Sequence, residues 1–180
     1  GGELARKYLR PRAELIAAVY EFWKQHALDD NVLGVHYRGT DKTEEAPRVS
    51  FDEMAATVEQ YLASHPDLRA VFVASDESAF VVFMMNRFTD IRVVARDDFR
   101  RSDGADSVHQ DLDNVVEIQR DAVINCLLLA RCASLVKTAS FLSAFAALLN
   151  PKLEPVMVNA PYEETLWFPE RQMLDRQMPR

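Results

Sequence analysis

The sequence predicts one domain of the α/β class, in which helices alternate with the strands of a mostly parallel sheet. Short apolar runs of strand length recur along the chain, and stretches with helical spacing of apolar residues separate them. Strands that alternate with helices of this length are joined by right-handed crossovers, which produce a parallel sheet. With 180 residues and 48% hydrophobic content, the chain is long enough for one domain with a sizeable core.

An amphipathic helix is predicted over residues 11–28, because Leu15, Val19 and Phe22 recur at helical spacing. We expect the apolar face of this helix to pack on the sheet. The first predicted strand follows at residues 32–38 and begins with the apolar run of residues 32–35.

A capping box opens the next predicted helix, which ends near Ser64. The Ser50 side chain can accept a hydrogen bond from the Glu53 amide, and the Glu53 side chain can accept one from the Ser50 amide. Strand and helix then continue to alternate. Strands are predicted at residues 70–74, 91–95, 134–138 and 155–159, and helices at residues 77–87, 114–133 and 141–149.

Two cysteines lie in the most apolar predicted helix, residues 114–133. Cys126 and Cys132 fall on different sides of a helix, so we expect buried thiols rather than a disulfide or a metal-binding pair. The four histidines are far apart, and none has a second histidine or a cysteine at the spacing of a zinc motif. The sequence therefore predicts no metal site and no cofactor.

Charge and hydropathy bear on the classes of partner. The formal net charge is −7 and the basic residues are scattered, whereas nucleic-acid binding needs a concentrated positive surface. We expect no nucleic-acid partner. No stretch reaches the roughly 20 apolar residues that cross a bilayer, and no signal peptide is visible, so a soluble fragment without membrane contact is expected.

Polar residues follow the apolar run Val32-Leu33-Gly34-Val35 directly, at the end of the first predicted strand. His36 and Arg38 are two positions apart, so both side chains point to one face at the carboxyl edge of the sheet, where open α/β sheets bind nucleotides. Arg38 can offer a planar fork of donors to phosphate oxygens, and Gly39 allows close approach of the backbone. Thr40 and Asp41 can tie the turn through local hydrogen bonds. The alternative is that Arg38 forms only a structural ion pair.

The string His36-Tyr37-Arg38-Gly39-Thr40-Asp41-Lys42 resembles the His-x-Arg-x-Thr-Asp-Lys motif of GDP-fucose-dependent fucosyltransferases. This group includes α1,6-fucosyltransferases, nodulation fucosyltransferases and protein O-fucosyltransferases. The resemblance implies that Arg38 holds the donor's pyrophosphate and that His36 lies against the nucleoside, with Gly39 beside them.

The same resemblance implies a catalytic set that extends past the motif. Asp41 and Lys42 would organise the loop beside the sugar. The family's catalytic base lies a few residues past the Lys, where Glu45 or Glu44 stands in this chain. Together with Arg38, the implied catalytic residues are Asp41, Lys42 and Glu45.

A second stretch, residues 122–147, resembles the family's third motif, which is a buried helix, a short strand and a Ser-rich turn that opens another helix. The resemblance implies donor contacts from Ser140, Phe141 and Ser143, the two serines being phosphate ligands. A helix N-terminus presents free N–H groups and a positive dipole end to an anion, which agrees with this role. Ser140 can also be an N-cap, and the two roles are compatible.

Two positions depart from the family pattern. Where the family has an Asp that contacts guanine, this chain has Asn125, an amide without the charge that favours pairing with guanine's adjacent donors. Asp121 lies four residues earlier on the same helical face and could substitute in part. Asp76 matches one member of the family's acidic pair as a donor contact, and Ser75 or Asp76 could alternatively cap the following helix.

The resemblance implies a Rossmann-like three-layer lobe with a mostly parallel sheet, formed by residues 1–180 as a fragment of a two-lobe glycosyltransferase. The implied partners are GDP-fucose or GDP and a glycan or protein acceptor. The implied reaction is an inverting, metal-independent transfer of fucose to a hydroxyl, and the isolated lobe is expected to be inactive. The compartment would be the cytoplasm for a bacterial source, or the Golgi or endoplasmic reticulum lumen for a eukaryotic one.

Two other functions stay open at this point. One is a degenerate lobe that serves as a nucleotide-sugar-binding or interaction module, which Asn125 favours. The other is a flavodoxin-like or receiver-like regulatory domain. The alternating pattern alone would fit such a domain, but it explains neither Arg38 nor the turn at Ser140.

Overall fold

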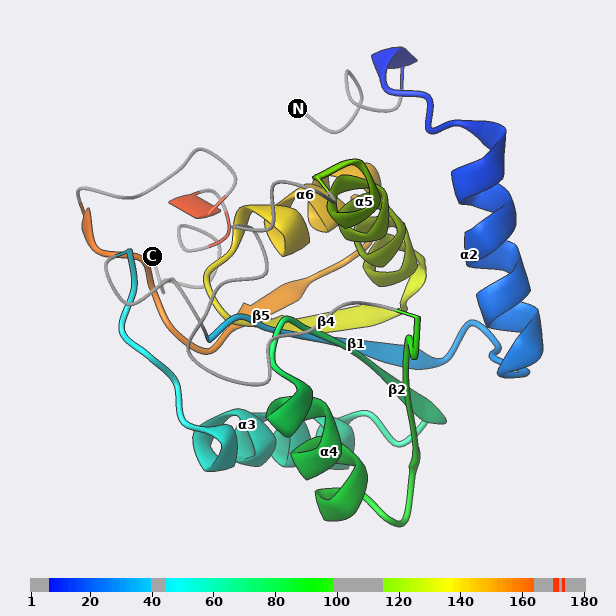
Figure 1. Cartoon of the computed structure of the whole chain (residues 1–180). Coiled ribbons are helices and arrows are strands. Elements are labelled where there is room, and N and C mark those ends of the chain that lie inside the picture. The colour runs from blue at the N-terminus through cyan, green and yellow to red at the C-terminus, as the bar shows by residue number, and fades with distance from the viewer. Residues whose placement is uncertain (1–6, 40–44, 99–114, 164–169, 172, 174–180) are drawn as a thin grey trace.

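The computed structural model describes residues 7–39, 45–98, 115–163, 170, 171 and 173. In this part of the chain a five-stranded sheet is covered by helices on both faces (Figure 1). The strands are β1 (Val32–Tyr37), β2 (Ala70–Ser75), β3 (Arg92–Ala95), β4 (Ser134–Lys137) and β5 (Pro155–Met157). The helices that pack on them are α2 (Ala13–Gln25), α3 (Phe51–Ser64), α4 (Ser78–Arg87), α5 (Val115–Arg131) and α6 (Phe141–Leu149).

The predicted alternation of strands and helices is confirmed, and the observed ends differ from the predicted ones by three residues or fewer. β1 ends at Tyr37, so Arg38 lies just beyond the strand. The capping box is confirmed in one direction, because the Glu53 amide donates to Ser50 Oγ over 3.2 Å. Cys126 and Cys132 are buried free thiols, as expected.

All strand pairs of the sheet are parallel, in the order β3-β2-β1-β4-β5. The chain first adds β2 and β3 on one side of β1, and then returns to place β4 and β5 on the other side. His36 at the end of β1 is in register with Ala74 of β2 and with Lys137 of β4. The reversal between β1 and β4 is a topological switch point, and open α/β sheets bind ligands in the crevice beyond the carboxyl ends of such strands.

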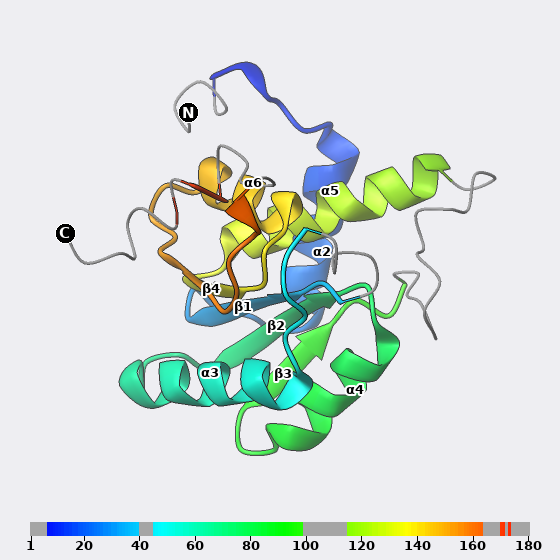
Figure 2. The ribbon, with the colours of Figure 1, turned by 90° about the vertical axis from the view of Figure 1, so that its left-hand side faces the viewer.

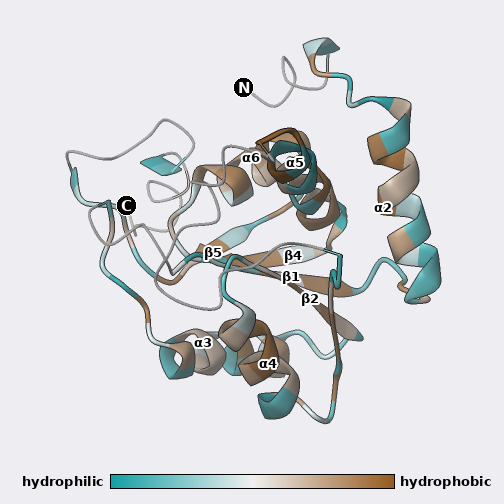
Figure 3. Cartoon of the chain, viewed as in Figure 1, coloured by the Kyte–Doolittle hydropathy of each residue, from teal (hydrophilic) through white to brown (hydrophobic). Residues whose placement is uncertain are grey.

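Helices α3 and α4 cover one face of the sheet, and α2, α5 and α6 cover the other (Figures 1 and 2). Successive residues of β1 point to opposite faces, so Leu33, Val35 and Tyr37 join the core under α3 and α4, whereas Val32 joins the other core. Strands buried on both faces are mainly apolar, and Figure 3 shows β1 and β2 brown over much of their length between the helices. The three-layer α/β architecture follows from this double burial.

Gly34 lies where α5 packs closely on β1. A Cβ atom at this position would lie 3.2 Å from Cys132 Sγ and 3.2 Å from Leu129 Cδ2. The substitution Gly34→Val is therefore expected to lower the free energy of unfolding by about 1 to 3 kcal/mol, because the added methyl groups overfill the space. Urea denaturation measures this change.

A second substitution tests whether this contact is the cause. Cys132→Ala removes the sulfur atom that faces Gly34, so it should recover part of the loss in the Gly34→Val background. Strictly additive effects of the two substitutions would contradict the proposed overlap.

Candidate functional site

The carboxyl ends of β1 and β4 lie side by side at the switch point, and two hydrogen bonds join the residues that follow them. The Thr138 amide donates to the His36 carbonyl over 3.0 Å, and the Arg38 amide donates to Thr138 Oγ1 over 2.9 Å. These bonds bring the polar string after β1 against the turn that opens α6, although Arg38 and Thr138 are 100 residues apart in sequence. The two predicted parts of the site therefore adjoin one another.

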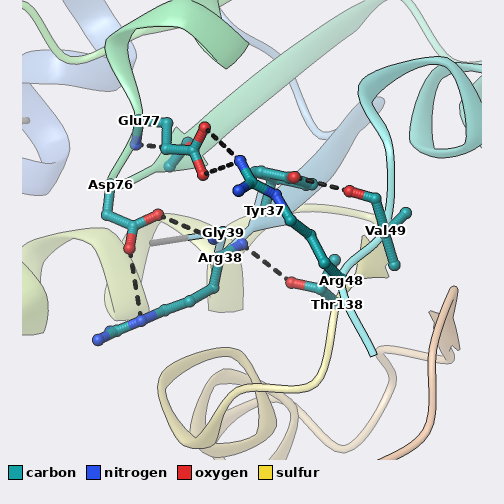
Figure 4. A network of polar contacts seen from close by, with 9 residues as sticks. Tyr37, Arg38, Gly39, Arg48, Val49, Asp76, Glu77 and Thr138 are labelled. Carbon is teal, nitrogen blue, oxygen red and sulfur yellow. Dashed lines mark hydrogen bonds and ion pairs between the residues drawn. The ribbon is translucent and has the colours of Figure 1, made fainter. Parts of the chain in front are cut away.

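Arg38 is held by Asp76, which follows β2 (Figure 4). Arg38 Nε lies 3.5 Å from Asp76 Oδ2, and the two side chains are only 14% and 11% exposed. The Gly39 amide donates to the other carboxylate oxygen, Oδ1, over 3.4 Å. The structural ion pair considered from the sequence is therefore present, and it lies at the carboxyl edge of the sheet.

Neither Ser75 nor Asp76 is the N-cap of α4, because that position belongs to Glu77. Ser75 Oγ instead accepts a hydrogen bond from the Glu77 amide over 3.1 Å and ties the turn before the helix. Asp76 faces Arg38 and Gly39. The capping alternative is therefore wrong for both residues.

The space beside Gly39 is filled by the Glu77 carboxylate. A Cβ atom on Gly39 would overlap Glu77 Oε1 and would lie 2.7 Å from Tyr37 Cε1. Glycine is thus required here for the close approach of Glu77. An approach of the Gly39 backbone to a phosphate stays a prediction.

Glu77 belongs to a second charged pair that sequence reasoning did not assign. Arg48 Nη2 lies 3.3 Å from Glu77 Oε1, and the Tyr37 hydroxyl nearby donates to the Val49 carbonyl over 2.7 Å (Figure 4). Burial raises the pKa of Glu77, and the positive charge of Arg48 opposes this shift. The adjacent acidic residues Asp76 and Glu77 were the available signal, but the sequence could not show that Arg48 meets the second one.

The His36 side chain lies on the face of the sheet that α5 and α6 cover, and the residue is 5% exposed. Loss of water around the ring, together with the nearby positive charges of Lys137 and Arg38, lowers the pKa of His36 to about 3. The imidazole is therefore neutral near pH 7. Within the described residues its Nδ1 atom has no hydrogen-bond partner.

Ser140 lies at the N-cap position of α6 in an extended conformation, with φ −169° and ψ 134°, but its side chain makes no capping hydrogen bond. Ser143 is fully buried, and its hydroxyl donates to the Ser140 carbonyl over 3.2 Å. Phe141, the first residue of the helix, is 45% exposed. Of these three predicted donor contacts, Phe141 is the one whose side chain reaches the surface.

A buried ion pair lies directly beneath the start of α6. Lys137 Nζ donates to Glu170 Oε1 over 2.7 Å and to Oε2 over 2.9 Å, and the Ser140 amide donates to Oε1 over 2.8 Å. Burial lowers the pKa of Lys137, and the Glu170 carboxylate opposes this shift. A lysine at the end of an apolar strand was a visible signal for a buried charge, but nothing in the sequence identified Glu170 as its partner.

Asn125 and Asp121, the two residues considered for guanine recognition, differ in their surroundings. Asn125 is buried on α5, the helix that packs on β1 and α6. Asp121 accepts a hydrogen bond from Arg96 Nη2 over 2.8 Å, and Arg96 also contacts both carboxylate oxygens of Asp98. Asp121 is thus already part of an ion-pair network at the end of β3.

The rest of the implied catalytic set is described only in part. Thr40, Asp41, Lys42 and Glu44 lie outside the described residues. Glu45 is half-buried, and its backbone carbonyl accepts a hydrogen bond from the Tyr162 amide over 2.8 Å. The chain segment after β5 therefore contacts the loop that would hold the base.

No group of three or more His, Cys, Asp and Glu side chains in the described part of the chain could hold a metal ion. No described helix combines the length and apolar character needed to cross a bilayer.

The depressed pKa of His36 predicts a loss of stability in acid. In the unfolded chain His36 has its ordinary pKa of 6.5, so it takes up a proton as the pH falls below this value. In the folded chain its pKa is about 3, so the ring stays neutral until the pH approaches 3. Between pH 7 and pH 5 this difference should remove about 2 kcal/mol of the free energy of unfolding. Denaturant titrations at both pH values measure the loss.

The variant His36→Gln lacks the titrating ring. Between pH 7 and pH 5 both proteins lose stability, and the loss in free energy of unfolding should be about 2 kcal/mol smaller for His36→Gln than for the unsubstituted chain. An equal fall in both proteins would show that His36 is not the group responsible.

Known proteins resemble this chain in structure rather than in sequence. No protein-family model matches the sequence, and no curated protein matches it. A NodZ alpha-1,6-fucosyltransferase soaked with GDP-fucose matches with a TM-score of 0.60 at 22% identity, over 84% of this chain and 48% of that chain. The NodZ structure from Bradyrhizobium gives a TM-score of 0.57 at 23% identity, over 78% of this chain and 43% of that chain.

Two further fucosyltransferases match in the same way. The match to POFUT1 in complex with GDP has a TM-score of 0.58 at 14% identity, and it covers 84% of this chain and 48% of the POFUT1 chain. The match to a mutant of Arabidopsis thaliana FUT1 in complex with GDP has a TM-score of 0.59 at 16% identity, and it covers 94% of this chain and 38% of the FUT1 chain.

The chain therefore spans less than half the length of each of these structures. At such identities the likeness establishes the fold. The structural neighbours are GDP-fucose transferases, the group that the two motifs resemble, and the chain has the Rossmann-like three-layer fold of one lobe of these enzymes.

Proposed function

We propose that this chain is the donor-binding lobe of a glycosyltransferase that transfers fucose from GDP-fucose to a hydroxyl of a glycan or a protein. The main support is the junction at the switch point, where the backbone amide of Arg38 donates to Thr138 Oγ1, two residues before the N-cap of α6. A guanidinium and a helix N-terminus are two groups that bind phosphate well. The structural neighbours include proteins solved with GDP or GDP-fucose.

In the proposed reaction an acceptor hydroxyl displaces GDP from the anomeric carbon of fucose, with inversion. Negative charge grows on the β-phosphate as the bond to the sugar breaks. Arg38 and the positive end of the α6 dipole would stabilise this charge, which is the part that a metal ion plays in other transferases. The proposal therefore needs no metal.

The other residues have proposed roles around this centre. Glu45 would accept the proton of the acceptor hydroxyl, while Asp41 and Lys42 would organise the loop beside the sugar. His36, which is neutral near pH 7, would lie against the nucleoside. Asn125 would accept a hydrogen bond from guanine.

We further propose that the lobe is part of a two-lobe enzyme and that the acceptor is held largely between the lobes. The chain spans less than half the length of the transferases that share its fold. The isolated lobe should accordingly bind the donor weakly and be inactive.

A non-catalytic nucleotide-sugar-binding module is the second candidate. Two observations favour it. Asn125 has an amide in place of a carboxylate, and the Asp121 carboxylate is already paired with Arg96, so neither residue offers an unpaired carboxylate to guanine. Both candidates predict nucleotide binding, and only the first predicts fucose transfer by the two-lobe protein.

We expect the chain to bind GDP in preference to ADP or UDP. Calorimetric titration with the three nucleotides, each with and without EDTA, measures this preference and the need for a metal. Equal affinity for all three would remove the guanine assignment, and an EDTA-induced loss that Mn²⁺ restores would remove the metal-independent mechanism. The variant Asn125→Asp should increase the preference for GDP if this residue faces the base.

Arg38→Lys is expected to weaken GDP binding by about 1 to 3 kcal/mol, because lysine keeps the charge but lacks the planar fork of donors. Titration calorimetry of the folded variant measures this change. Arg87→Lys is a matched control, since Arg87 pairs with Glu59 between α4 and α3, and it should leave GDP affinity unchanged. A destabilised Arg38→Lys variant with normal GDP affinity would show that Arg38 serves only its ion pair with Asp76.

A further inference from the structure

The turn between β4 and α6 is fixed by groups from three other parts of the chain. The Thr138 amide donates to the His36 carbonyl on β1 over 3.0 Å. The Ala139 amide donates to Asn159 Oδ1 over 2.7 Å, and the Ser140 amide donates to Glu170 Oε1 over 2.8 Å. Three consecutive backbone N–H groups thus have acceptors, and two of these acceptors are side chains that follow β5.

A buried ion pair with Lys137 also holds Glu170 in place. Lys137 and Glu170 are 0% and 3% exposed in their side chains, and both carboxylate oxygens accept hydrogen bonds from the ammonium group. A buried charge without a partner is costly, so the pair locks Glu170 in place. Its Oε1 atom then lies at the junction of two donors, Lys137 Nζ and the Ser140 amide.

Asn159 makes the equivalent connection on the other side of the turn. While its Oδ1 atom accepts from the Ala139 amide, its Nδ2 group donates to the Pro47 carbonyl over 2.7 Å. The Tyr162 amide donates to the Glu45 carbonyl over 2.8 Å. The segment after β5 therefore links the turn before α6 to the loop after β1.

We propose that Asn159 and Glu170 are positioning residues, which hold the turn formed by Thr138, Ala139 and Ser140 in the shape that receives the donor's phosphate. This inference rests on the proposed donor site. A competing possibility is that the Glu170 carboxylate occupies the phosphate position and must leave. The burial of Glu170 and its three hydrogen bonds argue against it, because such a carboxylate is part of the protein interior rather than a surface anion.

Two variants separate positioning of the turn from neutralisation of Lys137. Glu170→Gln keeps an oxygen acceptor for the Ser140 amide but leaves Lys137 without a counter-charge. We expect a melting temperature lower by roughly 10 °C with GDP affinity within about twofold of the unsubstituted chain, measured below the transition. The double variant Lys137→Met, Glu170→Met removes both charges and the acceptor, so the melting temperature should fall clearly less than in Glu170→Gln while GDP affinity falls about tenfold.

A third variant tests the other acceptor without touching the ion pair. Asn159→Ala should also weaken GDP binding several-fold, with only a small loss in melting temperature. Normal GDP affinity in both the double variant and Asn159→Ala would overturn the positioning role. Tighter binding by the double variant would show instead that Glu170 competes with the phosphate, and would also overturn it.

Amide hydrogen exchange decides the positioning role independently of nucleotide. Without any ligand, the Ser140 amide should be protected in the unsubstituted chain and in Glu170→Gln, and should exchange at least about tenfold faster in the double variant. Unchanged protection of Ser140 would overturn the proposal. If the unsubstituted chain shows no affinity for GDP while Ser140 follows the expected pattern, the proposed function fails and the fixing of the turn by Glu170 stands.

Discussion

The parallel pairing of β1 with β4 is the constraint on which the candidate site depends. The two strands are distant in sequence, and their register sets His36 opposite Lys137, so that Arg38 and Thr138 follow side by side. The first three strands build the sheet outward from β1 in one direction, and the crossover to β4 reverses that direction. A crevice can form only at such a reversal, because elsewhere the crossover helices continue over the sheet in one sense.

Fixed charges at the carboxyl ends of these strands occur in pairs. Arg38 is near Asp76, Arg48 is near Glu77, and Lys137 is bonded to Glu170. Each pairing limits the cost of burying at least one of its charges, since the side chains of Asp76, Glu77 and Lys137 are 11%, 11% and 0% exposed. Gly39 is part of the same arrangement, since only a glycine leaves room for the Glu77 carboxylate beside β1. The polar edge of the sheet is thus stabilised by contacts between segments rather than by exposure to water.

The sequence was sufficient for the fold because local patterns determine it. Strands buried on both faces read as apolar runs, and Ser50 with Glu53 marked a helix start that the structure confirms. The adjacency of Arg38 and the turn before α6 followed only from resemblance. Glu77, Arg48, Asn159 and Glu170 could not be predicted, because each acts through a partner that is distant in sequence, such as Lys137 and Glu170, which are 33 residues apart. Local spacing left capping by Ser75 or Asp76 open as an alternative, and it is wrong because Glu77 is the N-cap of α4 and Asp76 instead lies beside Arg38.

The pairing of charges also determines how an anion could be held at this edge. Among the described residues, the cations Arg38, Lys137 and Arg48 each have a carboxylate nearby, and His36 is neutral. A diphosphate would therefore be attracted less by net positive charge than by correctly oriented donors, such as guanidinium N–H groups and the first amides of α6. Oriented donors act only at the correct distance, so their effect depends on the shape of the turn that presents them. This dependence explains why side chains buried beneath the turn can govern binding without touching the ligand.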